Sequence, residues 1–111
     1  KEAVEWIRDN KEKAILATTI INVFELYAGA YNSKDPEKIK DLDELLSDFK
    51  ILQISFDIAK MAAQECVRLN SQGEKIDNSD LFIGVITLSE GYSLKTNNKK
   101  HFSRINGLRI I

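Results

Sequence analysis

The chain of 111 residues contains a single cysteine, Cys66, and a single histidine, His101. One cysteine cannot form an internal disulfide, which favours an intracellular protein. The sequence has no Cys/His spacing typical of zinc sites and no glycine-rich phosphate-binding loop. No Ser or Cys lies in a context that marks a catalytic nucleophile. Because no run of about 18 apolar residues occurs, no membrane-spanning helix is expected.

A strong charge of either sign is also lacking, because the formal net charge is −1. Bulk charge therefore does not indicate a nucleic-acid-binding protein. The segment 91–111 differs from the rest, since it has no acidic side chain and five basic ones: Lys95, Lys99, Lys100, Arg104 and Arg109. Such a segment can contact phosphates or form an ordinary solvated rim, and the charge pattern leaves both interpretations open.

What the sequence does contain is enough apolar side chain for one globular domain, with 43% hydrophobic and 30% charged residues. Short apolar runs alternate with helical patterns along the whole chain. This alternation predicts an α/β fold with a parallel sheet flanked by helices. We expect strands at 14–18, 51–54, 92–96 and 108–111, and helices at 2–10, 20–31, 36–49, 55–71, 80–90 and 99–104.

The first candidate site residue is Glu25, in the helix expected at 20–31. It shares one helical face with Ile21, Phe24 and Ala28, which are apolar. A carboxylate buried on an apolar face needs a partner or a metal ion. A half-solvated glutamate at the edge of the apolar stripe explains the same spacing, so the spacing alone leaves a functional role open.

The second candidate is Asp80, which opens a helix that is apolar almost all round, as buried helices are. Gly84 lies on the same face and would let another backbone or a ligand approach closely. With Asp77 as N-cap, a carboxylate in the first turn also suits the helix dipole. A purely structural role for Asp80 therefore stays open at this point.

Four segments, taken in order, resemble signatures of the PIN-domain family, and in particular of its VapC-type toxin ribonucleases. They are 18–29 (TTIINVFELYAG), 76–84 (IDNSDLFIG), 92–102 (YSLKTNNKKHF) and 106–110 (NGLRI). Each motif is weak alone, but the four occur in register and cover essentially the whole chain.

The resemblance implies a Mg²⁺-dependent endoribonuclease that is the toxin of a toxin–antitoxin pair. By position, Glu25, Asp80 and Asn98 would hold the metal, for which Mn²⁺ is a possible substitute. Thr96 would complete the catalytic set, as a hydroxyl that steadies the acidic cluster. Mg²⁺ suits a site of few carboxylates because it is a hard ion that retains several waters.

The resemblance also implies the partners of the protein. RNA would be the substrate, contacted by the basic segment through Lys99, Lys100, His101 and Arg104. A small antitoxin would silence the toxin by placing a basic side chain near the acidic pocket. A homodimer and a cytoplasmic location are expected for the same reason.

The sequence departs from the family pattern in two ways. The family's first strand ends in an active-site Asp, and nothing here matches it, since Lys1–Asn10 resembles the helix after that strand. We therefore expect a single PIN domain, 1–111, without its first, central strand, and a gap in the sheet between 14–18 and 92–96. The family's fourth acidic position falls on Asn98, whose amide oxygen can bind Mg²⁺ directly or through water.

Two alternatives remain on the sequence alone. One is a non-catalytic PIN-like module that binds RNA or protein, which Asn98 and the missing Asp favour. The other is a structural α/β interaction domain whose carboxylates only cap helices and form salt bridges. The second alternative predicts no metal binding.

Overall fold

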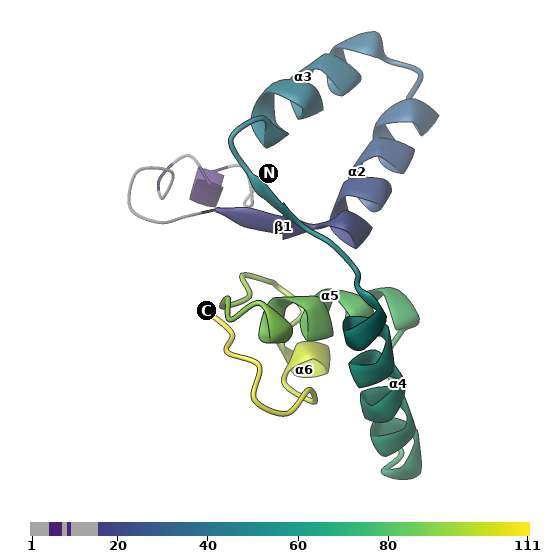
Figure 1. Cartoon of the computed structure of the whole chain (residues 1–111). Coiled ribbons are helices and arrows are strands. Elements are labelled where there is room, and N and C mark those ends of the chain that lie inside the picture. Colours follow the sequence, from purple (N-terminus) through teal and green to yellow (C-terminus); the bar gives the residue numbers. More distant parts are fainter. Residues whose placement is uncertain (1–4, 8, 10–15) are drawn as a thin grey trace. The chain divides into compact units, whose positions relative to one another are not determined.

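The computed structural model describes residues 5–7, 9 and 16–111, and the chain divides into two units, residues 1–51 and 52–111 (Figure 1). Residues 5–7 and 9 are helical, and the rest of the helix expected at 2–10 lies outside the described residues. Within the described residues, no helix is both long enough and apolar enough to cross a membrane.

The first unit consists of strand β1 (Ala17–Thr19) and a hairpin of two helices, α2 (Ile20–Asn32) and α3 (Pro36–Leu46) (Figure 1). The N–H of Asn22 donates to Thr19 Oγ1 at 3.1 Å, so Thr19 ends the strand and caps the helix, which begins at the predicted position. Asp35 caps α3, and Pro36 occupies its first turn, where no N–H is needed.

The sheet pairs β1 with β2 (Lys50–Leu52), the segment at which the chain passes from the first unit to the second. The N–H of Lys50 donates to the carbonyl of Leu16 at 3.0 Å. Strand–helix–helix–strand order and a parallel sheet confirm the predicted α/β class. The strand predicted at 14–18 is described from residue 16 onward, since residues 14 and 15 lie outside the described ranges.

The second unit is built on α4 (Phe56–Ser71), α5 (Asn78–Ser89) and the short α6 (Lys99–Phe102). Ser55 caps α4 by accepting from the N–H of Ile58 at 3.1 Å. The chain leaves α4 and α5 through Gly73 and Gly91, whose φ angles of 70° and 77° lie in the left-handed region that favours glycine.

Helix α5 is the core of this unit, and α4 and α6 pack against it (Figure 1). Its side chains from Ile83 to Thr87 are buried, which confirms the prediction of a helix that is apolar all round. A Cβ added at Gly84 would collide with the side chain of Ile105, and Phe102 and Leu108 lie next to it. The close approach predicted at Gly84 is therefore made by the segment that follows α6.

The two strands predicted at 92–96 and 108–111 are reduced to one parallel bridge between Leu94 and Ile110. The N–H of Leu94 donates to Arg109, and its carbonyl accepts from Ile111. The two ends of the segment 92–96 make local hydrogen bonds instead. The N–H of Tyr92 donates to the carbonyl of Thr87, and Thr96 Oγ1 accepts from the N–H of Asn98 in the turn that follows. Pairing is thus limited to the middle of the segment.

Candidate active site

Asp80 lies half-buried in the first turn of α5, at the edge of the second unit's core. The helix starts at Asn78, two residues earlier than predicted, with Asp77 in the N-cap position. Asp77 has the extended backbone conformation of an N-cap residue, as expected, but its side chain makes no capping hydrogen bond. The buried side chains that follow Asp80, from Leu81 onward, fix the helix and so the direction of its first turn.

The side chain of Asn98 meets that of Asp80, 18 positions away in the sequence. Asn98 Nδ2 donates to Asp80 Oδ2 at 3.4 Å. The same Nδ2 lies 3.0 Å from Nδ1 of His101, one turn further along α6. Two of the predicted site residues are therefore brought together, and a third, predicted to contact RNA, joins the same cluster.

The backbone of Asn98 is held on both sides. Its N–H donates to Thr96 Oγ1 at 3.0 Å, and its carbonyl accepts from the N–H of Phe102 at 3.3 Å. Phe102 is buried, at 4% exposure, and anchors α6. Thr96 thus acts on Asn98, through the backbone, and steadies the position from which Asn98 reaches Asp80.

The basic residues of the predicted RNA-contacting set fall into two groups. Lys99 and Lys100 are exposed on α6, immediately beside Asn98. The guanidinium of Arg104 is turned toward the loop before α5, where Nη1 donates to the carbonyls of Lys75 at 3.1 Å and Glu74 at 3.4 Å. Arg104 is therefore engaged within the fold, while the two lysines present their charge to solvent.

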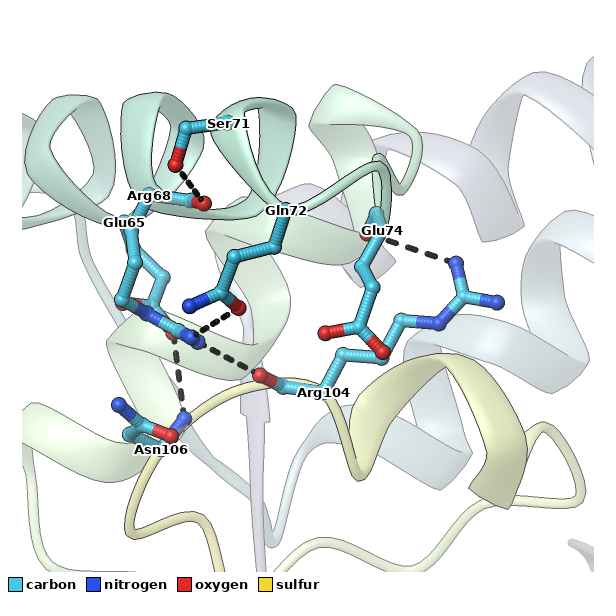
Figure 2. A network of polar contacts seen from close by, with 7 residues as sticks. All are labelled: Glu65, Arg68, Ser71, Gln72, Glu74, Arg104 and Asn106. Atoms are coloured by element: carbon cyan, nitrogen blue, oxygen red, sulfur yellow. Dashed lines mark hydrogen bonds and ion pairs between the residues drawn. The ribbon is translucent and has the colours of Figure 1, made fainter.

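A network that the sequence analysis did not find holds the segment after α6 to α4 (Figure 2). Glu65 accepts from Arg68 Nε at 2.9 Å and Nη2 at 2.6 Å, and from the N–H of Asn106 at 3.1 Å. Arg68 Nη2 also donates to the carbonyl of Arg104 at 2.7 Å. Glu65 and Arg68 lie three positions apart on one helix, a spacing from which their ion pair could have been predicted. No sequence pattern predicts their contacts with Arg104 and Asn106, which lie 36 and 41 positions away.

These contacts determine the electrostatics of the network. The guanidinium of Arg68 lowers the pKa of Glu65, an effect that burial opposes and the Asn106 N–H supports. The same hydrogen-bonded pairing raises the pKa of Arg68. The paired side chains bind the N–H of Asn106 and the carbonyl of Arg104, and so hold the segment that follows the C-terminal end of α6.

Glu25 is exposed on α2, which contradicts the buried-carboxylate interpretation, one of the two that its spacing left open. Phe24 beside it is 71% exposed, and Ala28 is exposed as well. Helix α2 has apolar side chains on more than one face, so the spacing could not select the buried one. The face that packs contains the half-buried Ile20, Val23 and Tyr27 and the buried Ala30.

Glu25 belongs to the first unit and Asp80 to the second, and the convergence of the two carboxylates stays a prediction. The same holds for the gap expected between the strands at 14–18 and 92–96. In the parts of the chain that the structure describes, there is no cluster of three or more Asp, Glu, His or Cys that could hold a metal ion.

The donor chemistry around Asp80 nevertheless fits a hard divalent cation. A half-buried carboxylate and a neighbouring amide group offer oxygen ligands, which Mg²⁺ prefers. One or two carboxylates are sufficient for Mg²⁺, because the ion keeps several of its waters. The exposed Lys99 and Lys100 add positive charge near the same place, which suits a phosphate-bearing ligand.

Comparison with known proteins places these residues in a family context. The sequence profile described as "PIN domain" matches residues 1–108. Ribonuclease VapC2 of Haemophilus influenzae is 33% identical over 103 residues, covering 92% of this chain and 78% of the relative. Ribonuclease VapC1 of Methanocaldococcus jannaschii is 32% identical over 96 residues, covering 85% and 68% respectively.

Solved structures give a similar result. VapBC2 from Rickettsia felis, bound to a DNA fragment from the promoter, aligns with a TM-score of 0.87 and 27% identity, over 100% of this chain and 84% of that one. DNA-bound VapBC from Salmonella typhimurium aligns with a TM-score of 0.85 and 26% identity, over 100% and 83%. Both likenesses extend over the entire α/β fold described above.

Proposed function

This chain belongs to the PIN-domain family, alongside the VapC ribonucleases, and from that premise we propose that it is the ribonuclease toxin of a toxin–antitoxin pair. The proposed reaction is Mg²⁺-dependent hydrolysis of RNA phosphodiester bonds. The observation that carries the proposal is the meeting of Asp80 and Asn98 across 18 sequence positions, at positions where the chain resembles the family's motifs.

Each residue has a proposed part. Asp80 and Glu25 supply carboxylates to the metal, and Asn98 supplies an amide group beside Asp80. Thr96 holds Asn98 through its backbone N–H. When bound, Mg²⁺ would stabilise negative charge on the phosphate and lower the pKa of an attacking water. Lys99 and Lys100 would bind the phosphates that flank the cleaved bond and orient the RNA.

The proposed partners follow from the same premise. The similar solved structures are VapBC complexes, which supports a small antitoxin protein as the partner of this chain. We place its basic side chain near Asp80 and Glu25. A homodimer in the cytoplasm completes the proposal, and light scattering of the purified protein measures its oligomeric state.

The direct test is cleavage of RNA with Mg²⁺, with Mn²⁺ and with a chelator, by the wild-type protein and by Asp80→Asn. We expect cleavage with either metal, none with the chelator, and none by Asp80→Asn. Asp77→Asn is the matched control, because it removes the same charge three residues away and Asn remains a good N-cap. Equal loss in both variants, or cleavage in the chelator, would contradict the proposal.

A non-catalytic PIN-like module that binds RNA or protein is the second candidate. The amide at position 98, in place of the family's fourth acid, favours it. This candidate predicts RNA binding that does not change with Asp80→Asn, and no cleavage with either metal. Filter binding of the same RNA, measured beside cleavage, separates the two functions.

A further inference from the structure

Arg104 connects the segment that follows α6 with the loop between α4 and α5. Its Nη1 donates to the carbonyls of Lys75 at 3.1 Å and Glu74 at 3.4 Å, and Figure 2 shows the second of these contacts. We propose that Arg104 is a positioning residue, whose guanidinium holds this loop and thereby orients the first turn of α5, which carries Asp80. The catalytic consequence of this role rests on the function proposed above.

The backbone of Arg104 is fixed on both sides, so its side chain starts from a defined place. Its N–H donates to the carbonyl of His101 in α6 at 3.2 Å, and its carbonyl accepts from Arg68 Nη2 of α4 at 2.7 Å. The next residue, Ile105, is 2% exposed, and its side chain occupies the space beside Gly84. A half-buried guanidinium on such a base restrains the loop to which it donates, because charge-assisted hydrogen bonds are stronger than neutral ones.

The loop that Arg104 binds leads directly into the first turn of α5. The N–H of Glu74 donates to the carbonyl of Leu69 at the end of α4 at 2.9 Å, and Ile76 is buried. Asp77 follows in the N-cap position, but its side chain makes no capping hydrogen bond. An N-cap side chain usually secures the first turn of a helix. Because that contribution is missing at Asp77, the loop before it has a larger part in holding the first turn.

The contacts of Arg104 join the two halves of the candidate site. Its guanidinium holds the loop that enters the helix of Asp80, and its N–H is bonded to the short helix that Asn98 begins. Asn98 Nδ2 and Asp80 Oδ2 are 3.4 Å apart, a long hydrogen bond that a small displacement of either segment weakens further. Arg104 therefore acts on the orientation of Asp80, with no contact of its own to the metal or the RNA.

Nitrogen-15 NMR of the metal-free wild-type protein tests the restraint without any variant. A guanidinium that holds two carbonyls moves little on the picosecond-to-nanosecond timescale. The Nε–Hε order parameter of Arg104 should therefore be close to that of rigid backbone, about 0.85. A value below about 0.6, as in flexible groups, would overturn the proposal, because a mobile side chain cannot hold the loop.

Arg104→Met and Arg109→Met form a matched pair for hydrogen exchange. Both remove one positive charge and one arginine that donates to a backbone carbonyl, but Arg109 Nη2 binds Gly91, beyond the other end of α5, at 2.9 Å. The N–H of Leu81 donates to the carbonyl of Asp77 in the first turn, and its exchange should become about 10-fold faster in Arg104→Met. Arg109→Met should leave it unchanged. Exchange that accelerates equally at every amide of α5 would show a general loss of stability and contradict a positioning role.

RNA cleavage separates positioning from phosphate binding. Positioning predicts that Arg104→Met lowers kcat by about 10-fold, with little change in KM or in the salt dependence of RNA binding. A phosphate contact predicts a raised KM and a salt slope reduced by about 0.7, and that result would refute the proposal. Failure of the proposed function looks different, because the wild type would then cleave no RNA with either metal. The NMR results on Arg104 and Leu81 would still decide whether Arg104 holds the loop.

Discussion

At the scale of single residues, Gly84 decides how closely α6 and its following segment can pack on α5. The space that a Cβ would need is occupied by the side chain of Ile105, which is 2% exposed, with Phe102 and Leu108 beside it. A methyl group at this position therefore requires a buried isoleucine to move. Since α6 carries Asn98 toward Asp80, this packing also bears on the candidate site.

Gly84→Ala is expected to destabilise the protein despite the better helix propensity of alanine. Overpacking costs about 1–3 kcal/mol, and alanine regains about 1 kcal/mol, so a net loss of up to about 2 kcal/mol should appear in urea unfolding. Gly29→Ala is the matched control, because nothing lies within 4 Å of the added atom. It should stabilise α2 by about 0.5–1 kcal/mol. Equal effects at both glycines would show that Ile105 does not restrict position 84.

Residue-scale reasoning from the sequence succeeded where neighbours in the chain decide the outcome. Thr19 caps α2, Pro36 opens α3, and Gly73 and Gly91 follow the ends of α4 and α5, close to the helix ends predicted at 71 and 90. Each of these depends on backbone geometry within a few residues. The same reasoning could not place Asp80 against Asn98, because the two are 18 positions apart and meet only when the chain between them folds.

At the scale of elements, the Glu65–Arg68 network joins α4 to the segment after α6 (Figure 2). Glu65→Gln keeps the shape of the side chain and removes its charge, so Arg68 and the N–H of Asn106 lose a charged acceptor. We expect the free energy of unfolding to fall by about 1–2 kcal/mol at pH 7. Glu44→Gln, an exposed change on α3, should alter it little.

The pH dependence of the Glu65→Gln effect has a definite sign. The pKa of Glu65 is lowered in the folded protein from an ordinary value of 4.5, so folding favours the charged form. The stability contributed by Glu65 is present above pH 4.5 and is lost as the pH falls through the lower, folded-state pKa. Wild type and Glu65→Gln should therefore converge in thermal unfolding below pH 4.5. A difference that stays constant into acid would mean that the charge of Glu65 does not matter.

The α2–α3 hairpin has its own polar contact, in which Tyr27 OH donates to Asp43 Oδ1 at 2.5 Å. This hydrogen bond raises the pKa of Tyr27, because the phenol must give up a proton that the carboxylate binds. A raised pKa stabilises the folded form at lower pH, and the gain is lost as the pH rises through the folded-state pKa.

Ultraviolet titration of tyrosinate provides the test at this site. Tyr27 should ionise above the ordinary value of 10.0, and both Tyr27→Phe and Asp43→Asn should remove that late component. Tyr92→Phe serves as control and should leave it in place. Persistence of the late component in Tyr27→Phe would assign it to another tyrosine.

At the scale of the whole molecule, the proposed metal site needs one carboxylate from each unit. Asp80 belongs to the second unit and Glu25 to the first, and the PIN-domain match spans both. If the two share one metal ion, Glu25→Gln and Asp80→Asn should each lower RNA cleavage by at least about 100-fold, more than the loss of a supporting residue. The double variant should cleave RNA about as fast as the less active of the two single variants, because the effects of residues that act as a unit are not additive. Losses that multiply would show independent roles.

The exposed lysines of α6 make a separate prediction about RNA. Lys99→Gln with Lys100→Gln should weaken RNA binding and reduce the slope of log K against log salt by about 1.4, as for two phosphate contacts with a single strand. Lys38→Gln with Lys40→Gln, two exposed lysines of α3, should leave the slope unchanged. Identical slopes for both pairs would show that the lysines beside Asn98 do not contact RNA.

By itself, the sequence determined the α/β class, the sites where most helices begin and end, and the burial of α5, because local hydrogen bonds and apolar periodicity decide these. Its motifs also predict Asp80 and Asn98 as metal ligands, which stays a prediction, and the structure brings these two side chains into contact. The tertiary structure decided which face of α2 is buried, since apolar side chains on several faces made the periodicity ambiguous. It also decided that His101 faces Asn98 and that Glu65 reaches Asn106, because such contacts depend on how distant segments pack.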